Sequence, residues 1–266
     1  MPFFQQNGLR YYTFDIFPVN ITQAVFTRQG GVSPRPWDSL NVGGMIGDDI
    51  THVRENRIRS FKALGCAPES IHDVWQVHSA DVVYADAPRP LDTEYQKADI
   101  ILTDNPDVTL FMRFADCTPI LLYDPEKQVI GLVHAGWLGT VRGAAGAAVR
   151  AMRARYASDP ADILAAIGPS IGPDHYEVGE DVIAQVREAF GEHAKSLLET
   201  HGESIHFNLW KANQIMLEKE GVKQIETAGI CTACYNDDWF SHRAEKGKTG
   251  RFGALLAHNK KESNVS

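Results

Sequence analysis

Short apolar runs that end in turn residues recur throughout the chain, and this pattern restricts the fold more than any other feature. Runs of strand length lie at 74–77, 82–85, 108–114, 120–123, 129–133 and 162–167. Stretches with helix-forming composition lie at 140–156, 179–189 and 208–220. Because strands and helices alternate without a strict βαβ rhythm, the sequence predicts an α+β fold in which mixed sheets are flanked by helices.

The composition indicates an ordinary globular chain. Of its 266 residues, 44% are hydrophobic and 23% are charged, values close to the averages for globular proteins. These values exclude a disordered, fibrous or coiled-coil chain. No shift in composition marks a domain boundary, so we expect a single domain over residues 1–258 and a polar C-terminal tail over 259–266.

The net charge of −8 restricts the partners of the chain. An acidic surface repels phosphate backbones and anionic lipids, so we expect neither nucleic acid nor a membrane as a partner. No apolar run approaches the roughly 20 residues of a membrane span, and Met1–Gln5 lacks the basic start of a signal peptide. We therefore expect a cytoplasmic chain whose four cysteines are thiols. A local cluster of arginines could still bind a small phosphorylated ligand.

Three apolar runs end at or just before residues that commonly bind metals. These residues are His78, Cys117 and His134, and loops at strand ends are where protein scaffolds place reactive groups. Two imidazoles and one thiolate would form a three-ligand zinc site with a fourth position open to water. The three residues lie far apart in sequence, so their grouping depends on the fold. Each alone also fits a structural role, as a hydrogen-bonded histidine or an inert small cysteine.

Several short motifs follow one another in order between about residues 24 and 256. They are FTRQGGVS at 26–33, SLN at 39–41, ENR at 55–57, QVH at 76–78, ADCTPILL at 115–122, HAGW at 134–137, GPSIG at 168–172, YEVG at 176–179, FSHR at 240–243 and TGR at 249–251. Together they resemble the YfiH-like family, which is also called the multicopper polyphenol oxidoreductase (laccase) family or DUF152. No single motif is decisive, but the ordered series is specific and covers nearly the whole chain.

The resemblance implies one zinc ion bound by His78, Cys117 and His134, in a YfiH-like fold similar to that of some cysteine hydrolases. It also implies phosphorolysis of adenosine, inosine and methylthioadenosine, and deamination of adenosine. The laccase name implies copper and phenol oxidation, but multicopper centres need many histidines. This chain has no His-x-His pair. We therefore expect Zn²⁺ as the cofactor, with Cu²⁺ able to occupy the same ligands in vitro.

Asp116 and Arg28 are the candidate catalytic residues. Zinc nucleobase deaminases carry His-x-Glu and Pro-Cys-x-x-Cys motifs. Here the predicted ligand His134 is followed by Ala135 and Gly136, and the Cys231–Cys234 pair is preceded by Ile230. Asp116, beside Cys117, is therefore the candidate proton shuttle, although its position also suits a carboxylate that only orients a ligand. Arg28 precedes Gly30 and Gly31, whose amides could help its guanidinium to hold phosphate. The alternative is that Arg28 caps a surface turn.

Four further residues are candidates for binding substrate. Asn41 could contact a hydroxyl or close a turn, and Arg57 could contact substrate or only pair with an acidic neighbour. Trp137, beside the predicted ligands, could stack on a purine or pack in the core. Leu138 stands where the family has arginine. We expect Arg142, one helical turn later, to restore that charge.

Other interpretations stay open at this point. Cys117 could be the nucleophile of a metal-free cysteine hydrolase or amidase, with His134 or His78 as its base, and the resemblance also implies amide cleavage in peptidoglycan precursors. Cys231 and Cys234 make only half of a zinc site, so we expect them to be buried structural thiols. The expected partners are a small purine nucleoside and phosphate, and we expect a monomer or a weak homodimer.

Overall fold

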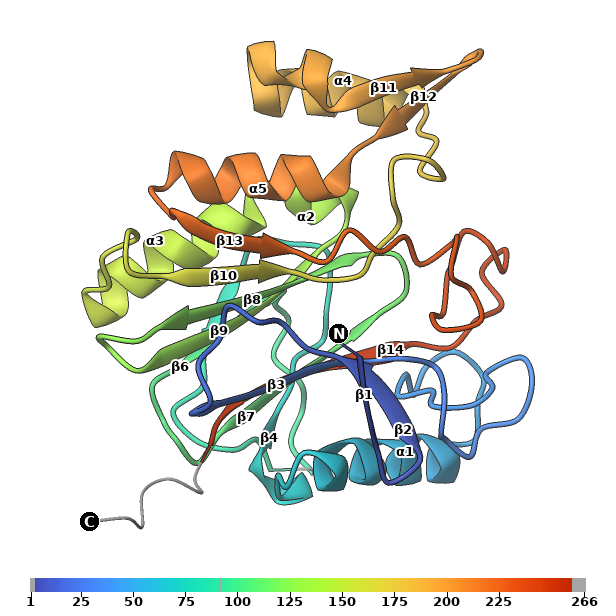
Figure 1. Cartoon of the computed structure of the whole chain (residues 1–266), viewed down its shortest axis with the longest axis vertical. Coiled ribbons are helices and arrows are strands. Elements are labelled where there is room, and N and C mark those ends of the chain that lie inside the picture. The colour runs from blue at the N-terminus through green and yellow to red at the C-terminus, as the bar shows by residue number, and fades with distance from the viewer. Residues whose placement is uncertain (1–2, 91, 260–266) are drawn as a thin grey trace.

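The first of two large sheets is built from both ends of the chain. Its strands are β1 (Phe3–Gln6), β2 (Leu9–Tyr12), β3 (Ile21–Phe26), β4 (Ile71–His72), β7 (Thr109–Phe114) and β14 (Phe252–His258). The second sheet contains β5 (Val82–Tyr84), β6 (Ile100–Thr103), β8 (Thr118–Asp124), β9 (Val129–Ala135), β10 (Leu164–Ile167) and β13 (Gln224–Thr227). The computed structural model describes residues 3–90 and 92–259 (Figure 1).

Both sheets are mixed. The strand order is β1-β2-β3-β14-β7-β4 in the first sheet and β13-β10-β8-β9-β6-β5 in the second. Most neighbours pair antiparallel, whereas β4–β7, β5–β6 and β10–β13 pair parallel. The predicted architecture of mixed sheets flanked by helices is therefore confirmed.

The structure describes five α-helices, and three of them cover the outer faces of the sheets (Figure 1). They are α1 (Ile50–Ala63), α2 (Trp137–Val141), α3 (Ala144–Tyr156), α4 (Glu180–Phe190) and α5 (Leu209–Lys219). Two short 3₁₀ helices, η1 (Pro68–Ser70) and η2 (Gly191–Ser196), and the hairpin of β11 (Leu198–His201) and β12 (Ser204–Phe207) complete the elements. Helix α1 packs on the first sheet, and α3 and α5 pack on the second.

The alternating side chains of the central strands create separate apolar layers. On β8, Leu121 and Tyr123 point into the core between the two sheets, whereas Ile120 and Leu122 point towards α3 and α5. Every residue of β8 and β9 is buried, which explains why both read as continuous apolar runs. Burying each large apolar side chain contributes about 1.5–3 kcal/mol, so these two strands are a rigid base for the loops at their ends.

Two sequence-based predictions need correction. Residues 74–77 do not form a strand: only Trp75 bridges to Lys97. The amide of Val77 donates instead to the carboxylate of Asp99, and such side-chain acceptors compete with a sheet ladder. The helix predicted over 140–156 is also two helices, α2 and α3, because Gly143 between them has φ +77°.

The remaining expectations about the chain concern its tail and membranes. Asn259 donates hydrogen bonds to the carbonyls of Asn20 and Val19. The rest of the predicted polar tail, 260–266, lies outside the described residues. Among the helices that the structure describes, none combines the length and the apolar character needed to cross a bilayer.

Candidate functional site

The fold brings the three predicted metal ligands together. The Nε2 atom of His78 lies 3.9 Å from Sγ of Cys117, and the ring centroids of His78 and His134 are 5.1 Å apart. One ligand atom from each of the three residues lies within 4.8 Å of the others. Their donor set of two imidazole nitrogens and one thiol sulfur is typical of a zinc site with an open position.

Strand ends and unusual backbone positions place these ligands. His134 lies in β9 and Cys117 lies in the turn between β7 and β8. Two residues in this region have positive φ without being glycine, His78 at +59° and Asp116 at +76°. Positive φ is uncommon in residues other than glycine, and it persists only where the surrounding contacts hold the backbone in place. Residues of this kind cluster at functional sites.

Asp99 fixes the positions of both histidines. Its Oδ1 accepts a hydrogen bond from Nδ1 of His134 at 2.8 Å, and its Oδ2 accepts from the amides of Val77 and Ser79, on either side of His78. Asp99 is fully buried. A carboxylate behind a histidine is the usual support of a metal ligand. Asp99 was not predicted from the sequence, although an acidic side chain at the start of an apolar strand is a usable signal.

The charges of Cys117 and His134 depend on each other. Burial raises the pKa of Cys117, but the positive charge of His134 and hydrogen bonds from His134 and His78 outweigh it and lower the pKa to about 6. Burial lowers the pKa of His134, but the charge of Cys117 and the hydrogen bond to Asp99 raise it to about 9. Near neutral pH the metal-free pair is therefore a thiolate and an imidazolium.

A cavity of about 550 Å³ opens over the three ligands, within the roughly 300–1,000 Å³ common for small-molecule sites. Its wall combines apolar and aromatic side chains with several cations. The lining residues are Gly43, Gly44, Met45, Ile46, Trp75, Gln76, His78, Arg113, Ala115, Asp116, Cys117, His134, Trp137, Tyr176, His242, Arg243 and Arg251. Arg243 and Arg251 belong to the sequence motifs FSHR and TGR, and no role was predicted for either residue.

Three arginines share one buried carboxylate behind the wall, and of these residues only Arg113 lines the cavity. Arg57, Arg89 and Arg113 approach the carboxylate of Asp73 at 3.6, 2.9 and 3.3 Å. Burial and the neighbouring charge of Arg57 lower the pKa of Arg113. One carboxylate cannot neutralise three guanidinium groups, so the cluster keeps a positive charge where Arg113 reaches the cavity.

Arg243 and Arg251 add further cations from the C-terminal loops. Nη1 of Arg243 donates to the carbonyl of Glu177 at 2.9 Å, and its guanidinium lies 5.2 Å from the ring centroid of Tyr176. Nη1 of Arg251 donates to the carbonyl of Gly250 at 2.8 Å. A guanidinium has five N–H donors, so each arginine keeps donors that can serve an anion in the cavity.

Asp116 lies in the cavity wall with both carboxylate oxygens engaged. Oδ1 accepts from the hydroxyl of Thr232 at 2.7 Å, and Oδ2 accepts from the amide of Arg243 at 2.7 Å. These contacts tie the Cys117 turn to the segment that carries Arg243. The geometry therefore favours the orienting role over the proton-shuttle role.

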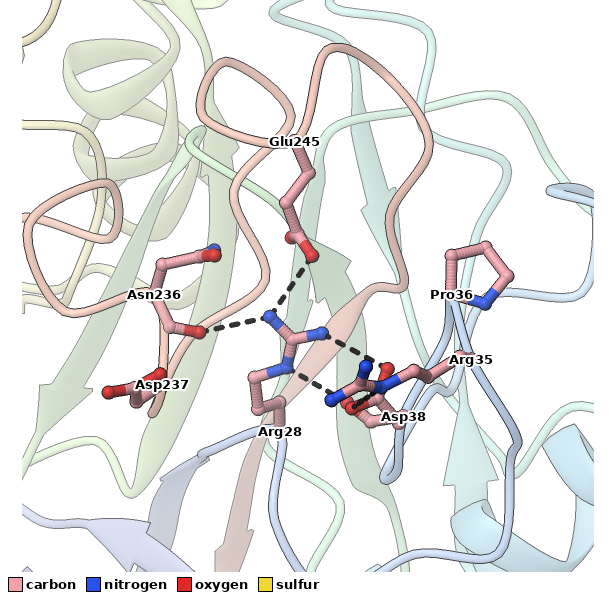
Figure 2. A pocket seen from close by; sticks show the side chains of 7 residues that line it. All are labelled: Arg28, Arg35, Pro36, Asp38, Asn236, Asp237 and Glu245. Atoms are coloured by element: carbon pink, nitrogen blue, oxygen red, sulfur yellow. Dashed lines mark hydrogen bonds and ion pairs between the residues drawn. The ribbon is translucent and has the colours of Figure 1, made fainter.

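Arg28 does not line this cavity, contrary to the expectation that it holds phosphate there. Its Nε donates to the carbonyl of Asp38 at 2.9 Å, and its Nη1 donates to the carbonyl of Asn236 and to Glu245 (Figure 2). The guanidinium also stacks over Phe240 at 4.4 Å. Arg28 thus fastens loops around a separate hollow, because its donors already have protein acceptors.

Asn41 and Arg57 also bind the protein itself. Asn41 is fully buried, and its Oδ1 accepts from the amides of Gly43 and Arg251. Arg57 donates to the carbonyl of Val42. Neither lines the cavity. Both support its wall indirectly, and their predicted contact with substrate stays a prediction.

The α2 segment contributes Trp137 to the cavity and Arg142 to its support. Trp137 lines the cavity and packs partly against the apolar cluster around α4. Nη1 of Arg142 donates to the carbonyl of His78 at 2.9 Å. Arg142 is not among the lining residues, and its contact supports the His78 loop. Its role in restoring the charge absent at Leu138 stays a prediction.

Cys231 and Cys234 were both expected to be buried thiols, and this holds for only one of them. Cys231 is buried, but Cys234 is exposed. Both are free thiols, and they lie beside Asp174 and His175.

Known proteins are similar to this chain in sequence and in fold. Residues 22–259 match the family described as "Multi-copper polyphenol oxidoreductase laccase". A purine nucleoside phosphorylase of Deinococcus radiodurans is 40% identical, with 91% of each chain covered. The purine nucleoside phosphorylase YfiH of Shigella flexneri is 35% identical, with 90% of this chain and 94% of the relative covered. The crystal structure of YlmD from Geobacillus stearothermophilus superposes with a TM-score of 0.90 at 33% identity, covering 97% of this chain and 99% of that one.

Proposed function

The chain belongs to the YfiH-like family described as multi-copper polyphenol oxidoreductase laccase, and from this premise we propose that it is a zinc-dependent purine nucleoside phosphorylase. The names of its relatives support this activity. Its proposed substrates are phosphate and adenosine, inosine or methylthioadenosine, with adenosine deamination as a second activity in the cytoplasm. The observation that carries the proposal is one cavity that combines the metal-donor group with Arg113, Arg243 and Arg251.

The residues around the donor group fit a metal ion. A Cβ atom at Gly136 would lie 2.7 Å from Sγ of Cys117 and 3.2 Å from Cδ2 of His78. Glycine therefore keeps a hollow directly beside the ligands. Nδ1 of His134 is used by Asp99, which leaves Nε2 as its ligand atom. Zinc bound there would supply Lewis-acid polarisation of a substrate oxygen.

The chain itself would bind and orient the two substrates. Trp137 and Tyr176 offer aromatic surfaces on which a purine can stack. Arg113, Arg243 and Arg251 supply the donors and the positive charge that a phosphate dianion needs. Phosphorolysis breaks the glycosidic bond as a phosphate oxygen attacks C1′ of the ribose. Fixing both substrates in one cavity lowers the entropic part of the barrier.

The test is to incubate the purified chain with adenosine, with and without phosphate, and to separate adenine, inosine and hypoxanthine by chromatography. We expect phosphate-dependent adenine that a His78→Ala variant no longer forms, which also controls for contaminants. Inosine alone would support deamination and overturn phosphorolysis. If adenosine is left unchanged, both activities are overturned.

A cysteine hydrolase is the second candidate function. The contacts link Cys117 to His134 and His134 to Asp99, as in a triad of nucleophile, base and orienting carboxylate. In this case Cys117 would attack an amide such as that of a peptidoglycan precursor, without a metal. Alkylation of Cys117 by iodoacetamide while the co-purified metal stays bound would support the hydrolase and contradict the zinc site.

Copper-dependent phenol oxidation is less well supported by the ligands. His78, Cys117 and His134 match the ligand set of one electron-transfer copper. A multicopper cluster requires many more histidines than this group contains. Oxygen uptake with a phenol, in the copper-loaded chain, would favour oxidation over phosphorolysis.

A further inference from the structure

Four potential metal ligands meet at a second place, on the loops that follow β10 and β13. They are Asp174, His175, Cys231 and Cys234, and one ligand atom from each lies within 4.8 Å of the others. Cys231 is buried and the other three are exposed. Within the described residues, none of the four lines the cavity above His78, Cys117 and His134.

The donor atoms converge on one point. Nδ1 of His175 lies 3.4 Å from Sγ of Cys234, 3.8 Å from Sγ of Cys231 and 3.1 Å from Oδ2 of Asp174. A ring nitrogen carries one proton or one lone pair, so it cannot satisfy three neighbours by hydrogen bonding. Zinc bonds of about 2.0–2.3 Å in a tetrahedron place neighbouring ligands roughly 3.3–3.8 Å apart. The three distances from Nδ1 are close to those edges.

We propose that Asp174, His175, Cys231 and Cys234 bind a structural zinc ion. Two thiolates, one imidazole and one carboxylate complete a tetrahedron from protein ligands alone, and closed sites of this kind are structural. The Asp174–Cys234 contact, 2.8 Å without an ion, would widen as the sulfur turns from the carboxylate to the metal. Binding replaces the two thiol protons, which pass to solvent.

The backbone around the four residues is arranged for their close approach. The amide of Gly172 donates to Sγ of Cys231 at 3.2 Å, a contact that orients a sulfur ligand. A Cβ atom at Gly172 would lie 2.5 Å from Oδ1 of Asp174 and 3.0 Å from Cβ of Cys231. Ser170 and Thr232 join the same two loops through the Thr232 amide and the Ser170 carbonyl, 3.1 Å apart.

The second site would fasten two parts of the cavity wall. Tyr176 directly follows His175 and lines the cavity. Thr232 directly follows Cys231 and donates to Asp116 beside Cys117. An ion that joins the two loops would therefore fix the position of Tyr176 relative to Asp116 in the cavity wall. The ion itself would lie outside the cavity.

The decisive experiment measures zinc in the Cys117→Ser background, where the first donor group lacks its thiolate. The full-length chain is reduced, stripped with a chelator, loaded with Zn²⁺ and desalted, and zinc per chain is measured by mass spectrometry. We expect this chain to retain zinc, and a further Cys231→Ser/Cys234→Ser change to remove it. Cys66→Ser in the same background is the matched control and should retain it. This result does not depend on any enzymatic activity.

Two further measurements cover the case in which the double serine variant fails to fold. Asp174→Asn and His175→Ala alter exposed side chains, and each should weaken zinc binding by at least roughly tenfold in a chelator competition. Co²⁺ in the Cys117→Ser chain should give thiolate-to-cobalt absorption bands that both variants shift or weaken. The proposal is overturned if the Cys117→Ser chain binds no zinc, or if its zinc affinity and cobalt spectrum are the same in all variants.

Discussion

The Asp99 carboxylate accepts a hydrogen bond from Nδ1 of His134 at 2.8 Å, and this contact organises the whole donor group. The second oxygen of Asp99 holds the amides of Val77 and Ser79. One buried side chain therefore fixes the ring of one histidine and the loop of the other. The hydrogen bond from His134 also lowers the pKa of Asp99, although burial alone would raise it.

An Asp99→Asn substitution should weaken metal binding by roughly tenfold to a hundredfold. The amide has nearly the same size as the carboxylate but one acceptor fewer, so either His134 or the His78 loop loses its partner. Zinc affinity in a chelator competition measures the effect. Asp81→Asn, at an exposed position nearby, is the control and should keep the wild-type affinity. Equal affinities in the two variants would contradict the supporting role of Asp99.

Gly136→Ala should also impair the metal site without unfolding the chain. Gly136 has φ −73° and ψ −179°, a conformation open to alanine, but the new Cβ would lie 2.7 Å from Sγ of Cys117. The ligand sulfur must then move, so we expect zinc affinity to fall at least roughly tenfold, with an unchanged circular dichroism spectrum. Gly139→Ala meets only contacts of 3.4 Å or more. It is the matched control.

The sequence predicted the centre of the fold because its signals there are local. The strands β7, β8 and β9 are apolar runs bounded by turns, and the predicted ligands Cys117 and His134 follow from where these runs end. Helix α1 was missed because its buried face includes Asn56 and Ser60, so its apolar periodicity is weak. Its Asp49 cap, which accepts from the amide of Thr51, was the available signal.

The parts of the site that sequence reasoning missed depend on contacts between distant segments. Arg113 and Arg251 come together in the cavity wall because β7 pairs with β14. The residues next to them in the sequence give no signal of this pairing. Arg28 looked like a phosphate ligand because its partners, Asn236 and Glu245, lie more than two hundred residues away. A residue type can suggest a role, but the fold decides which groups compete for its donors.

In the metal-free chain, alkylation of Cys117 by iodoacetamide should follow a midpoint near pH 6. The pKa of Cys117 is lowered to about 6 by the charge and hydrogen bonds of its histidine neighbours, and the thiolate is the reactive form. The rate should therefore be low below pH 6 and nearly constant above pH 7. Peptide mass spectrometry follows the modification. In the denatured chain the midpoint should rise towards the ordinary ~8.5, and added zinc should protect the sulfur.

His134→Gln separates the cause of this shift from general burial. The substitution removes the cation that faces Cys117, so burial, which raises the pKa of the thiol, would dominate. We expect the alkylation midpoint to move up by more than one pH unit. An unchanged midpoint would show that His134 is not the group that stabilises the thiolate.

Arg251→Ala should raise the KM for phosphate by roughly tenfold to a hundredfold, as expected for losing a charge-assisted hydrogen bond of about 1.5–3 kcal/mol. Arg251 lines the cavity. Burial lowers its pKa, whereas the negative charges of Cys117 and Asp116 raise it, so these two groups lie near its guanidinium. An anion bound beside it would therefore contact both the guanidinium and the donor group. Initial rates at varied phosphate and saturating adenosine measure the effect. Arg155→Ala, on the exposed side of α3, is the control. A change in the KM for adenosine alone would instead place the nucleoside, and not phosphate, against Arg251.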